Sequence, residues 1–442
     1  MVSRSILMFP IKVLLFWNIL TILLFIFSPF EWPIAIENYI LLLIFLGICL
    51  FFLRLGYLVG LKNSFKLNYK PPTNLLSKWF TISLLLKLVW TLPSYCDRLG
   101  LDLLDFKAMF LRLAIGFTNF GESYAYRSMI VFEKTGLLMF ITKQILYAIT
   151  SLTIPLGIIL WSKLNITKKT IIVAFIIIDV LYWMGIGTNV GVVNNFLTIF
   201  FMIALTHPKL TDFSKLKLKY KIYIGSILFL ILSLFSLNIS QRHDYNTNGK
   251  YDLYEIKIGK VRINKDCLLF NITNPSLHGT IISTSTYLNQ GYYHLALAFD
   301  EKFEWTYGLG NNYTMLGISK KIAGENLMPR TYISKLEKKG VDPFVNWHSA
   351  YLWFANDLTF FGVPVLIFFI GLLFAVSWKS TIKLNDPFAP VIFIFCLVEI
   401  FFLCANNQVL SFSFYPFHIL LLLWILVRFK YAKKSISPDI SC

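Results

Sequence analysis

Residues that can bind anions and move protons are concentrated at the two ends of one polar segment, residues 240–347. Arg242 and His243 stand at its start, and Trp347 and His348 at its end. An arginine can give two parallel hydrogen bonds to phosphate oxygens, and a neutral imidazole can act as a general base near neutral pH. The segment therefore carries candidates for an anion site and for acid–base catalysis.

Arg330 and Asp357 extend this set. Arg330 follows Pro329 and could converge with Arg242 on one anion, although a lone arginine near a membrane surface more often anchors its helix or pairs with an acid. Asp357 lies in an apolar run nine residues after His348, and acids in such runs usually face a bundle interior and have a function. Nine residues are about two and a half helical turns, so the two side chains need not share a face. His348 could equally be a hydrogen-bonded structural histidine.

The chain around this segment is too apolar for a water-soluble protein. Hydrophobic residues make up 57% of the 442 residues and charged residues 14%, against about 25% charged in an ordinary soluble domain. A helix needs about 20 apolar residues to cross a bilayer. The sequence therefore predicts an all-α polytopic membrane protein with about ten transmembrane helices and one large outer loop between helices 7 and 8. The ten apolar runs lie near residues 12–30, 38–58, 78–95, 136–160, 170–187, 190–206, 221–239, 355–377, 388–404 and 409–428.

The basic residues indicate which side of the membrane each loop occupies. Alternate connecting segments hold 21 Lys and Arg but only three acids, which accounts for the whole net charge of +18, because the rest of the chain has 20 of each. The positive-inside rule places these segments in the cytoplasm, so both termini are cytoplasmic and residues 240–347 lie outside. Nucleic acid is therefore not expected as a partner. The basic segments are the N-terminus, 54–78, 163–169, 209–221, 379–386 and the chain from Arg428.

The chain divides into three parts at the large loop. Residues 1–239 hold the first seven spans, with an amphipathic outer segment near 96–134, and residues 348–442 hold the last three spans and a cytoplasmic tail. Within the loop, two alternating runs around Gly259-Lys260 predict a β-hairpin. Residues 278–299 predict a helix that rests near the membrane.

Cysteine and charge patterns indicate neither a metal nor a cofactor. The chain has no CxxC or HExxH pattern, so no metal site is expected. Cys96 and Cys267 both fall on the outer side, which leaves a disulfide between them open. Ionisable residues inside the spans are expected to pair structurally and not to relay protons: Lys87 or Lys143 with Asp179, and Glu399 with His418.

A series of short aromatic and polar motifs runs through residues 285–362. They are Ser285-Thr-Tyr-Leu-Asn-Gln-Gly-Tyr292, Leu295-Ala-Leu297, Trp305-Thr-Tyr-Gly-Leu-Gly310, Pro329-Arg-Thr-Tyr332 and Trp347-His-Ser-Ala-Tyr351, followed by Asp357 and Gly362. With the outer turn Gly187-Thr-Asn189, this pattern resembles the O-antigen polymerases (Wzy-type) of bacterial envelopes. Two positions depart from that family: Val190 stands in place of a basic residue, and His294 in place of a small one.

The resemblance implies a metal-independent membrane glycosyltransferase with a GT-C-like fold in the bacterial inner membrane. Such an enzyme joins oligosaccharide repeat units, carried on undecaprenyl diphosphate, into the O-antigen of lipopolysaccharide or a similar surface polysaccharide. The transfer takes place at the periplasmic face, with lipid diphosphate as the leaving group and no cofactor. Its expected partners are membrane lipid and a chain-length regulator protein. An O-antigen ligase, or a flippase or transporter of lipid-linked glycans, remains an alternative.

The resemblance also assigns roles to the polar residues. The acceptor hydroxyl needs a base, for which His348 and Asp357 are the catalytic candidates. Fixed guanidinium donors stabilise the charge that develops on a leaving diphosphate, a role expected of Arg242 and Arg330. The remaining substrate contacts are expected to come from one histidine and four aromatic residues: His243, Tyr287, Trp305, Tyr307 and Trp347.

Overall fold

The protein is a multi-pass, all-α membrane protein. The computed structural model describes residues 4–62, 71–129, 137–211, 258–343, 345–383 and 386–433, with scattered residues between 218 and 241. These described residues form 17 α-helices, and six helical stretches are long and apolar enough to cross a membrane. The six are α1 (Arg4–Ile26), α2 (Ile36–Lys62), α3 (Leu75–Arg98), the stretch Leu138–Ile159 formed by α6 (Leu137–Thr150) and α7 (Thr153–Ile159), α16 (Ala350–Lys383) and α18 (Phe414–Lys433).

Large apolar side chains cover the outside of these helices. Phe16 of α1, Phe51 of α2, Val89 of α3 and Phe369 of α16 are all exposed in the isolated chain. A surface helix of a soluble protein would place charged residues on this side. The exposed apolar faces are explained by contact with lipid, which agrees with the predicted class of protein.

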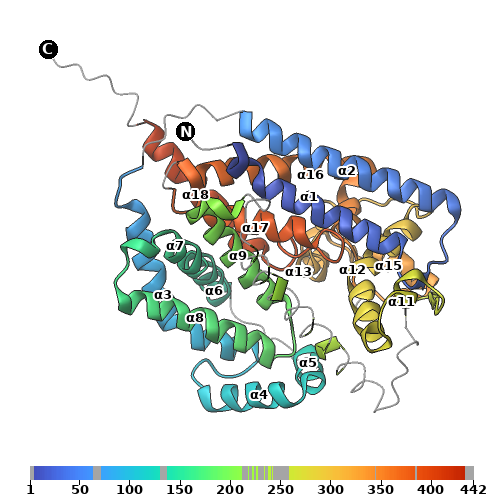
Figure 1. Cartoon of the computed structure of the whole chain (residues 1–442), viewed down its shortest axis with the longest axis horizontal. Coiled ribbons are helices and arrows are strands. Elements are labelled where there is room, and N and C mark those ends of the chain that lie inside the picture. Colours follow the sequence, from blue (N-terminus) through green and yellow to red (C-terminus); the bar gives the residue numbers. More distant parts are fainter. Residues whose placement is uncertain are drawn as a thin grey trace.

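Small residues let the long helices pack closely. Figure 1 shows α1, α2 and α16 running nearly parallel along one side of the molecule. A Cβ atom on Gly56 of α2 would lie 2.0 Å from the carbonyl oxygen of Phe368 in α16, and one on Gly371 would lie 2.4 Å from that of Leu53. Glycines at such contacts are typical of membrane helices, because they allow two backbones to approach.

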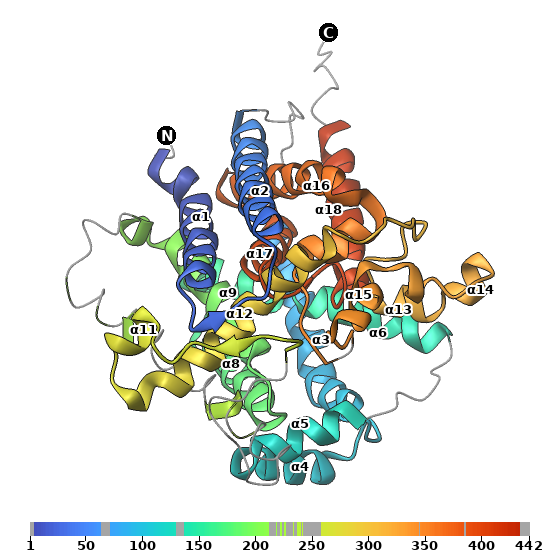
Figure 2. The same ribbon diagram turned by 90° about the vertical axis from the view of Figure 1, so that its right-hand side faces the viewer.

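A short helix, α17 (Ala389–Phe402), forms the centre of the bundle. In Figure 2 it lies among α1, α2, α9 (Val190–Thr206) and α16, and nearly all of its side chains are buried. The indole N–H of Trp17 in α1 donates to the carbonyl oxygen of Phe401, and the two rings stack at 4.4 Å. The N-terminal and C-terminal parts of the chain are therefore joined in one core.

The remaining helices before the large loop stand beside this bundle. α8 (Ile166–Gly185) packs with α9, while α4 (Phe106–Thr118) and α5 (Phe120–Met129) lie across one end of α8 (Figures 1 and 2). The Asp105 carboxylate caps α4 by accepting from the amide of Ala108 at 3.0 Å. The described part of the predicted amphipathic segment near 96–134 contains these two helices. The predicted seventh run, 221–239, lies mostly outside the described residues.

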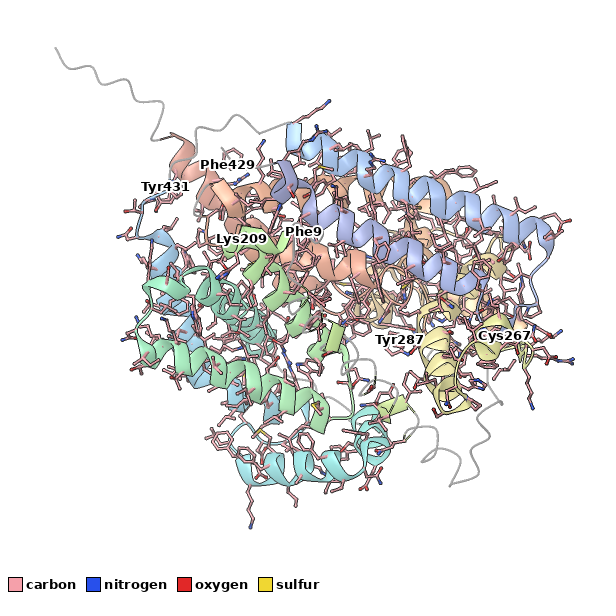
Figure 3. The ribbon with its side chains drawn as sticks, viewed as in Figure 1. Phe9, Lys209, Cys267, Tyr287, Phe429 and Tyr431 are labelled. Atoms are coloured by element: carbon pink, nitrogen blue, oxygen red, sulfur yellow. The ribbon has the colours of Figure 1, made fainter. Side chains whose placement is uncertain are left out.

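The polar segment folds around α12 (His278–Ala298). This helix was expected to rest near the membrane, but most of its second half is buried, from Asn289 to Ala296. The described part of the segment also contains short helices: α11 (Leu268–Asn271), α13 (Tyr313–Gly317), α14 (Ser319–Ala323) and α15 (Tyr332–Lys335), of which α15 packs against α12. Figure 3 places Tyr287 and Cys267 of this region at the opposite end of the molecule from Phe429 and Tyr431 of α18.

The fold bears on two features that the sequence analysis raised, the β-hairpin and the disulfide. β2 (Arg262–Ile263) pairs antiparallel with β1 (Phe30–Glu31), so its partner lies far back in the chain. The other half of the predicted hairpin, residues 255–257, is outside the described residues. Cys96 and Cys267 are both free and buried, and the disulfide left open above is not formed.

Candidate functional site

The centre of the candidate site is the contact between α12 and the turn before α16. His294 Nδ1 donates a hydrogen bond to the carbonyl oxygen of Trp347 at 2.9 Å. The ring of His348 lies beside that of His294, with centroids 4.8 Å apart. The ring of Trp347 meets that of Tyr287 edge to face at 5.9 Å. Three of the predicted residues, Tyr287, Trp347 and His348, are therefore brought together.

A glycine sets the distance between these two segments. A Cβ atom on Gly291 would lie 2.2 Å from the carbonyl oxygen of Cys404 and 2.8 Å from the amide nitrogen of Ser349. The amide of Ala350 in turn donates to the carbonyl oxygen of Leu403 at 3.0 Å. Only a residue without a side chain lets α12 approach both backbones, so Gly291 positions the turn that carries His348.

Several buried polar atoms here have no partner in the described part of the protein. We call Ser285, Asn289, His294 and His348 the α12 polar set. The unpartnered atoms are the Ser285 hydroxyl, both amide atoms of Asn289, Nε2 of His294 and both ring nitrogens of His348. A buried polar group without a hydrogen bond costs about 1–3 kcal/mol, and such groups in a folded protein call for an explanation, a ligand or a catalytic role among them.

Burial also decides the charge of the two histidines. Removal from water lowers the pKa of His294 to about 3, although its bond to the Trp347 carbonyl acts in the opposite direction. Burial, together with the neighbouring His294, holds the pKa of His348 well below its usual range. Both imidazoles are neutral at physiological pH. His348 therefore has a free ring nitrogen that can accept a proton.

A second group of predicted residues lies on the surface of the polar segment. Arg330 donates from Nη2 to Glu325 at 2.7 Å and from Nη1 to the Tyr307 hydroxyl at 3.2 Å. The rings of Trp305 and Tyr307 stand 5.0 Å apart, edge to face, and these residues are 54% and 47% exposed. Their exposed faces could pack against sugar rings, next to an arginine that is already paired with one acid.

Asp357 holds this surface in place. Its Oδ1 accepts hydrogen bonds from the Thr306 hydroxyl at 2.5 Å and from the amide of Gly308 at 2.8 Å. The intervening Tyr307 has a φ of 55°, a strained value for a residue with a side chain. The carboxylate thus fixes the turn that presents Trp305 and Tyr307. This is a positioning role. A catalytic role of Asp357 as a general base stays a prediction.

Of the two partners expected for Asp179, Lys143 is wrong, whereas the charge of Lys87 does interact with that of Asp179, without an ion pair within 4.0 Å among the described residues. Lys143 pairs with Asp97 at 2.5 Å and not with Asp179. Asp179 instead accepts from the Tyr95 hydroxyl at 2.8 Å and from the Asn195 amide at 2.5 Å. Neighbouring helix faces decide these pairs, and spacing along the chain does not reveal which faces meet.

The expected pair of Glu399 and His418 is wrong too. Glu399 accepts from the amides of Val409 at 2.5 Å and Leu410 at 3.3 Å, so it closes the turn after α17. His418 Nδ1 donates to the carbonyl oxygen of Phe414 at 2.7 Å and is exposed. Both side chains have local structural roles.

Arg242 and His243 lie outside the described residues. The residue before them, Gln241, accepts a hydrogen bond from the amide of Phe120 at 3.2 Å. The beginning of the polar segment therefore lies at the start of α5. Whether Arg242 converges with Arg330 remains a prediction.

The sequence analysis placed Ser285, Asn289 and Gly291 in one of the quoted motifs but assigned them no role. Ser285 and Asn289 are four residues apart, so they share a face of α12. This spacing is the feature of the sequence that could have identified them as a pair. Their burial could not be inferred, because a helix rich in Ser, Thr and Tyr is usually placed at a surface.

No protein family, curated protein or solved structure matches this chain. Among the described residues, no group of three or more His, Cys, Asp and Glu is arranged to hold a metal ion. The fold and the site together define a multi-pass α-helical membrane protein with a buried polar set at one end of its bundle.

Proposed function

We propose that this protein is a membrane glycosyltransferase of the O-antigen polymerase kind. It joins oligosaccharide repeat units carried on undecaprenyl diphosphate at the periplasmic face of a bacterial inner membrane. The proposal includes ten membrane spans, cytoplasmic termini and a polar segment, 240–347, that faces outward. It draws on the distribution of basic residues, on the sequence resemblance and on the α12 polar set.

The observation that carries the proposal is the environment of His348. Its two ring nitrogens are buried without partners among the described residues, beside His294 and next to the Tyr287–Trp347 pair. A sugar hydroxyl that donates to the imidazole would satisfy one of these atoms. The aromatic pair offers an apolar edge against which a sugar ring can pack.

In the proposed reaction, the acceptor hydroxyl oxygen attacks the anomeric carbon of the donor glycan and loses its proton to His348. The bond between the anomeric carbon and the diphosphate oxygen breaks, and the electron pair leaves with the lipid diphosphate. A base works best when its pKa is near the ambient pH. An anionic diphosphate close to His348 would raise the pKa of this imidazole toward that range, because it stabilises the imidazolium form.

Arginine donors would stabilise the leaving group in this scheme. Arg330 is the described candidate, and it would exchange Glu325 for diphosphate oxygens while the Tyr307 hydroxyl holds its orientation. Arg242 and His243 are proposed as further contacts at the start of the same segment. Trp305 and Tyr307 are proposed to bind the glycan.

The test is the surface glycan of a strain that lacks the gene. A polymerase defect leaves single repeat units attached to the surface, and the His348→Ala variant should give this same pattern when it is supplied to the deletion strain. His207→Ala is the matched control, because His207 is an exposed histidine at the basic, cytoplasmic end of α9. Long polymer in the His348→Ala strain would refute the assignment of the base.

The same strain separates the alternatives. Complete absence of attached glycan would indicate an O-antigen ligase. Lipid-linked units trapped inside would indicate a flippase or transporter, a function favoured by one observation: the ionisable residues Asp97, Lys143 and Asp179 within the helices.

A further inference from the structure

Ionisable side chains that the proposed reaction does not use meet between α3, α6 and α8. Figure 1 shows these helices grouped on the side away from α2, with α4 and α5 across their outer end. The central cation is Arg98, the last residue of α3. Its surroundings differ from those of the other arginines described above.

Aromatic rings enclose the Arg98 guanidinium. Its Cζ lies 4.9 Å from the ring centroid of Tyr147 and 5.6 Å from that of Trp183. The rings of Tyr95 and Tyr182 stack nearby at 3.9 Å. The Tyr147 hydroxyl also accepts a hydrogen bond from Arg98. Rings that pack against a guanidinium restrict its orientation, and the remaining N–H groups of its five can bind an anion.

No acid of the described residues forms a direct ion pair with Arg98, although the charge of Asp179 acts on it from a greater distance. Within the described residues, no carboxylate lies within 4.0 Å of its guanidinium. The two nearest acids are engaged elsewhere: Asp97 by Lys143 at 2.5 Å and Asp179 by Tyr95 at 2.8 Å. A cation inside a membrane protein without a direct ion pair is costly, and it suggests a functional site, for which an anion is the natural ligand.

The depth of Arg98 indicates where that anion comes from. α4 begins shortly after α3 ends, and near its start Leu104 is 74% exposed, with Phe110 and Leu111 exposed as well. A helix with such an apolar face lies at the bilayer surface, at the level of the lipid headgroups. Arg98 therefore ends α3 at the depth where lipid phosphates lie.

We propose that Arg98 binds the phosphate or diphosphate of a membrane lipid, at a site separate from the α12 polar set. Its place in catalysis rests on the proposed function. Joining two lipid-linked glycans requires two lipid diphosphates to be held at once, and Arg98 holds the second of them. Gln241, bonded to the start of α5, brings the beginning of the outer segment to this same end of the molecule.

The test counts lipid diphosphates bound to the purified full-length protein. Farnesyl diphosphate serves as the short-chain probe, in a neutral detergent, and its bound number is measured by native mass spectrometry. Arg98→Gln should lower that number by one and weaken the affected binding by about tenfold or more, as expected for a charge-assisted contact. Arg98→Lys, which keeps the charge for folding, should weaken it less.

The matched control is Lys169→Gln. Lys169 also places its charge over an aromatic ring, 5.6 Å from the centroid of Trp161, but near the start of α8, at the end away from Arg98. Its removal should leave probe binding unchanged. If Arg98→Gln and Arg98→Lys both bind the probe like the parent protein, the site is refuted.

Competition separates the two sources of phosphate. If phosphatidylglycerol does not displace farnesyl diphosphate, the result supports a site for the prenyl carrier. Displacement at equal concentration would make Arg98 a headgroup site and overturn its role as the second substrate site. The number of bound lipids does not depend on polymer formation. Normal polymer in the strain that lacks the gene would therefore reject the proposed function without affecting this result.

Discussion

Substitution of Gly291 by alanine tests whether the contact of α12 with the turn before α16 positions the site. The new Cβ would lie 2.2 Å from the Cys404 carbonyl oxygen, whereas ordinary contact begins at 3.4 Å. The obstructing atoms are backbone on both sides, so α12 must move by about 1 Å or the turn must give way. Overpacking of this kind costs about 1–3 kcal/mol.

The effect on activity should exceed the effect on folding. A shift of about 1 Å between His348 and the bound substrate can lower a rate by about 100-fold. We therefore expect Gly291→Ala to fold, to melt at a lower temperature in detergent and to leave mainly single repeat units on the surface. Gly47→Ala in α2 is the matched control, because no atom lies within 4 Å of its new Cβ. Wild-type melting and polymer length in Gly291→Ala would refute the packing that we describe.

Three further predictions concern charge and hydrogen bonding. Burial lowers the pKa of His294 to about 3, while its unfolded pKa is about 6.5, so the unfolded chain takes up protons first as the pH falls. The free energy of unfolding should then drop by about 2 kcal/mol between about pH 7.5 and about pH 5, and a melting temperature that does not change with pH would contradict this. Asp357→Asn weakens the acceptor for Thr306 and Gly308, so the free energy of unfolding should fall by about 2 kcal/mol and proteolysis at residues 305–312 should be faster. An unchanged digestion pattern would argue against the positioning role. Arg330→Lys keeps the charge but loses the paired N–H donors of the guanidinium, so polymer yield should fall about tenfold. Unchanged yield would remove Arg330 from the diphosphate site.

The membrane helices could be predicted from the sequence because a bilayer imposes a simple rule of length and apolarity. The runs at 12–30, 38–58 and 78–95 correspond to α1, α2 and α3. Helix α12 could also be predicted as a helix. Its burial could not, because its polar side chains gave no indication that other helices would cover it.

Roles that depend on distant partners could not be predicted either. An acid at 357 within an apolar run suggested a catalytic base, but its donors, Thr306 and Gly308, lie about 50 residues upstream. In the same way, Arg262–Ile263 has the character of a strand, yet its partner is Phe30–Glu31. Such pairings are set by tertiary structure, on which local patterns carry no information.

The most direct test of the account is whether the polar segment faces away from the cytoplasm. Val345 is 73% exposed in this segment, and the described cysteines are all buried, so Val345→Cys offers a reactive thiol. Lys209→Cys, at the basic end of α9, is the control for the cytoplasmic side. We predict that a membrane-impermeant maleimide added to intact cells labels Val345→Cys and reaches Lys209→Cys only after the membrane is opened. The reverse pattern would place His348 and Arg330 inside the cell and contradict a reaction at the outer face.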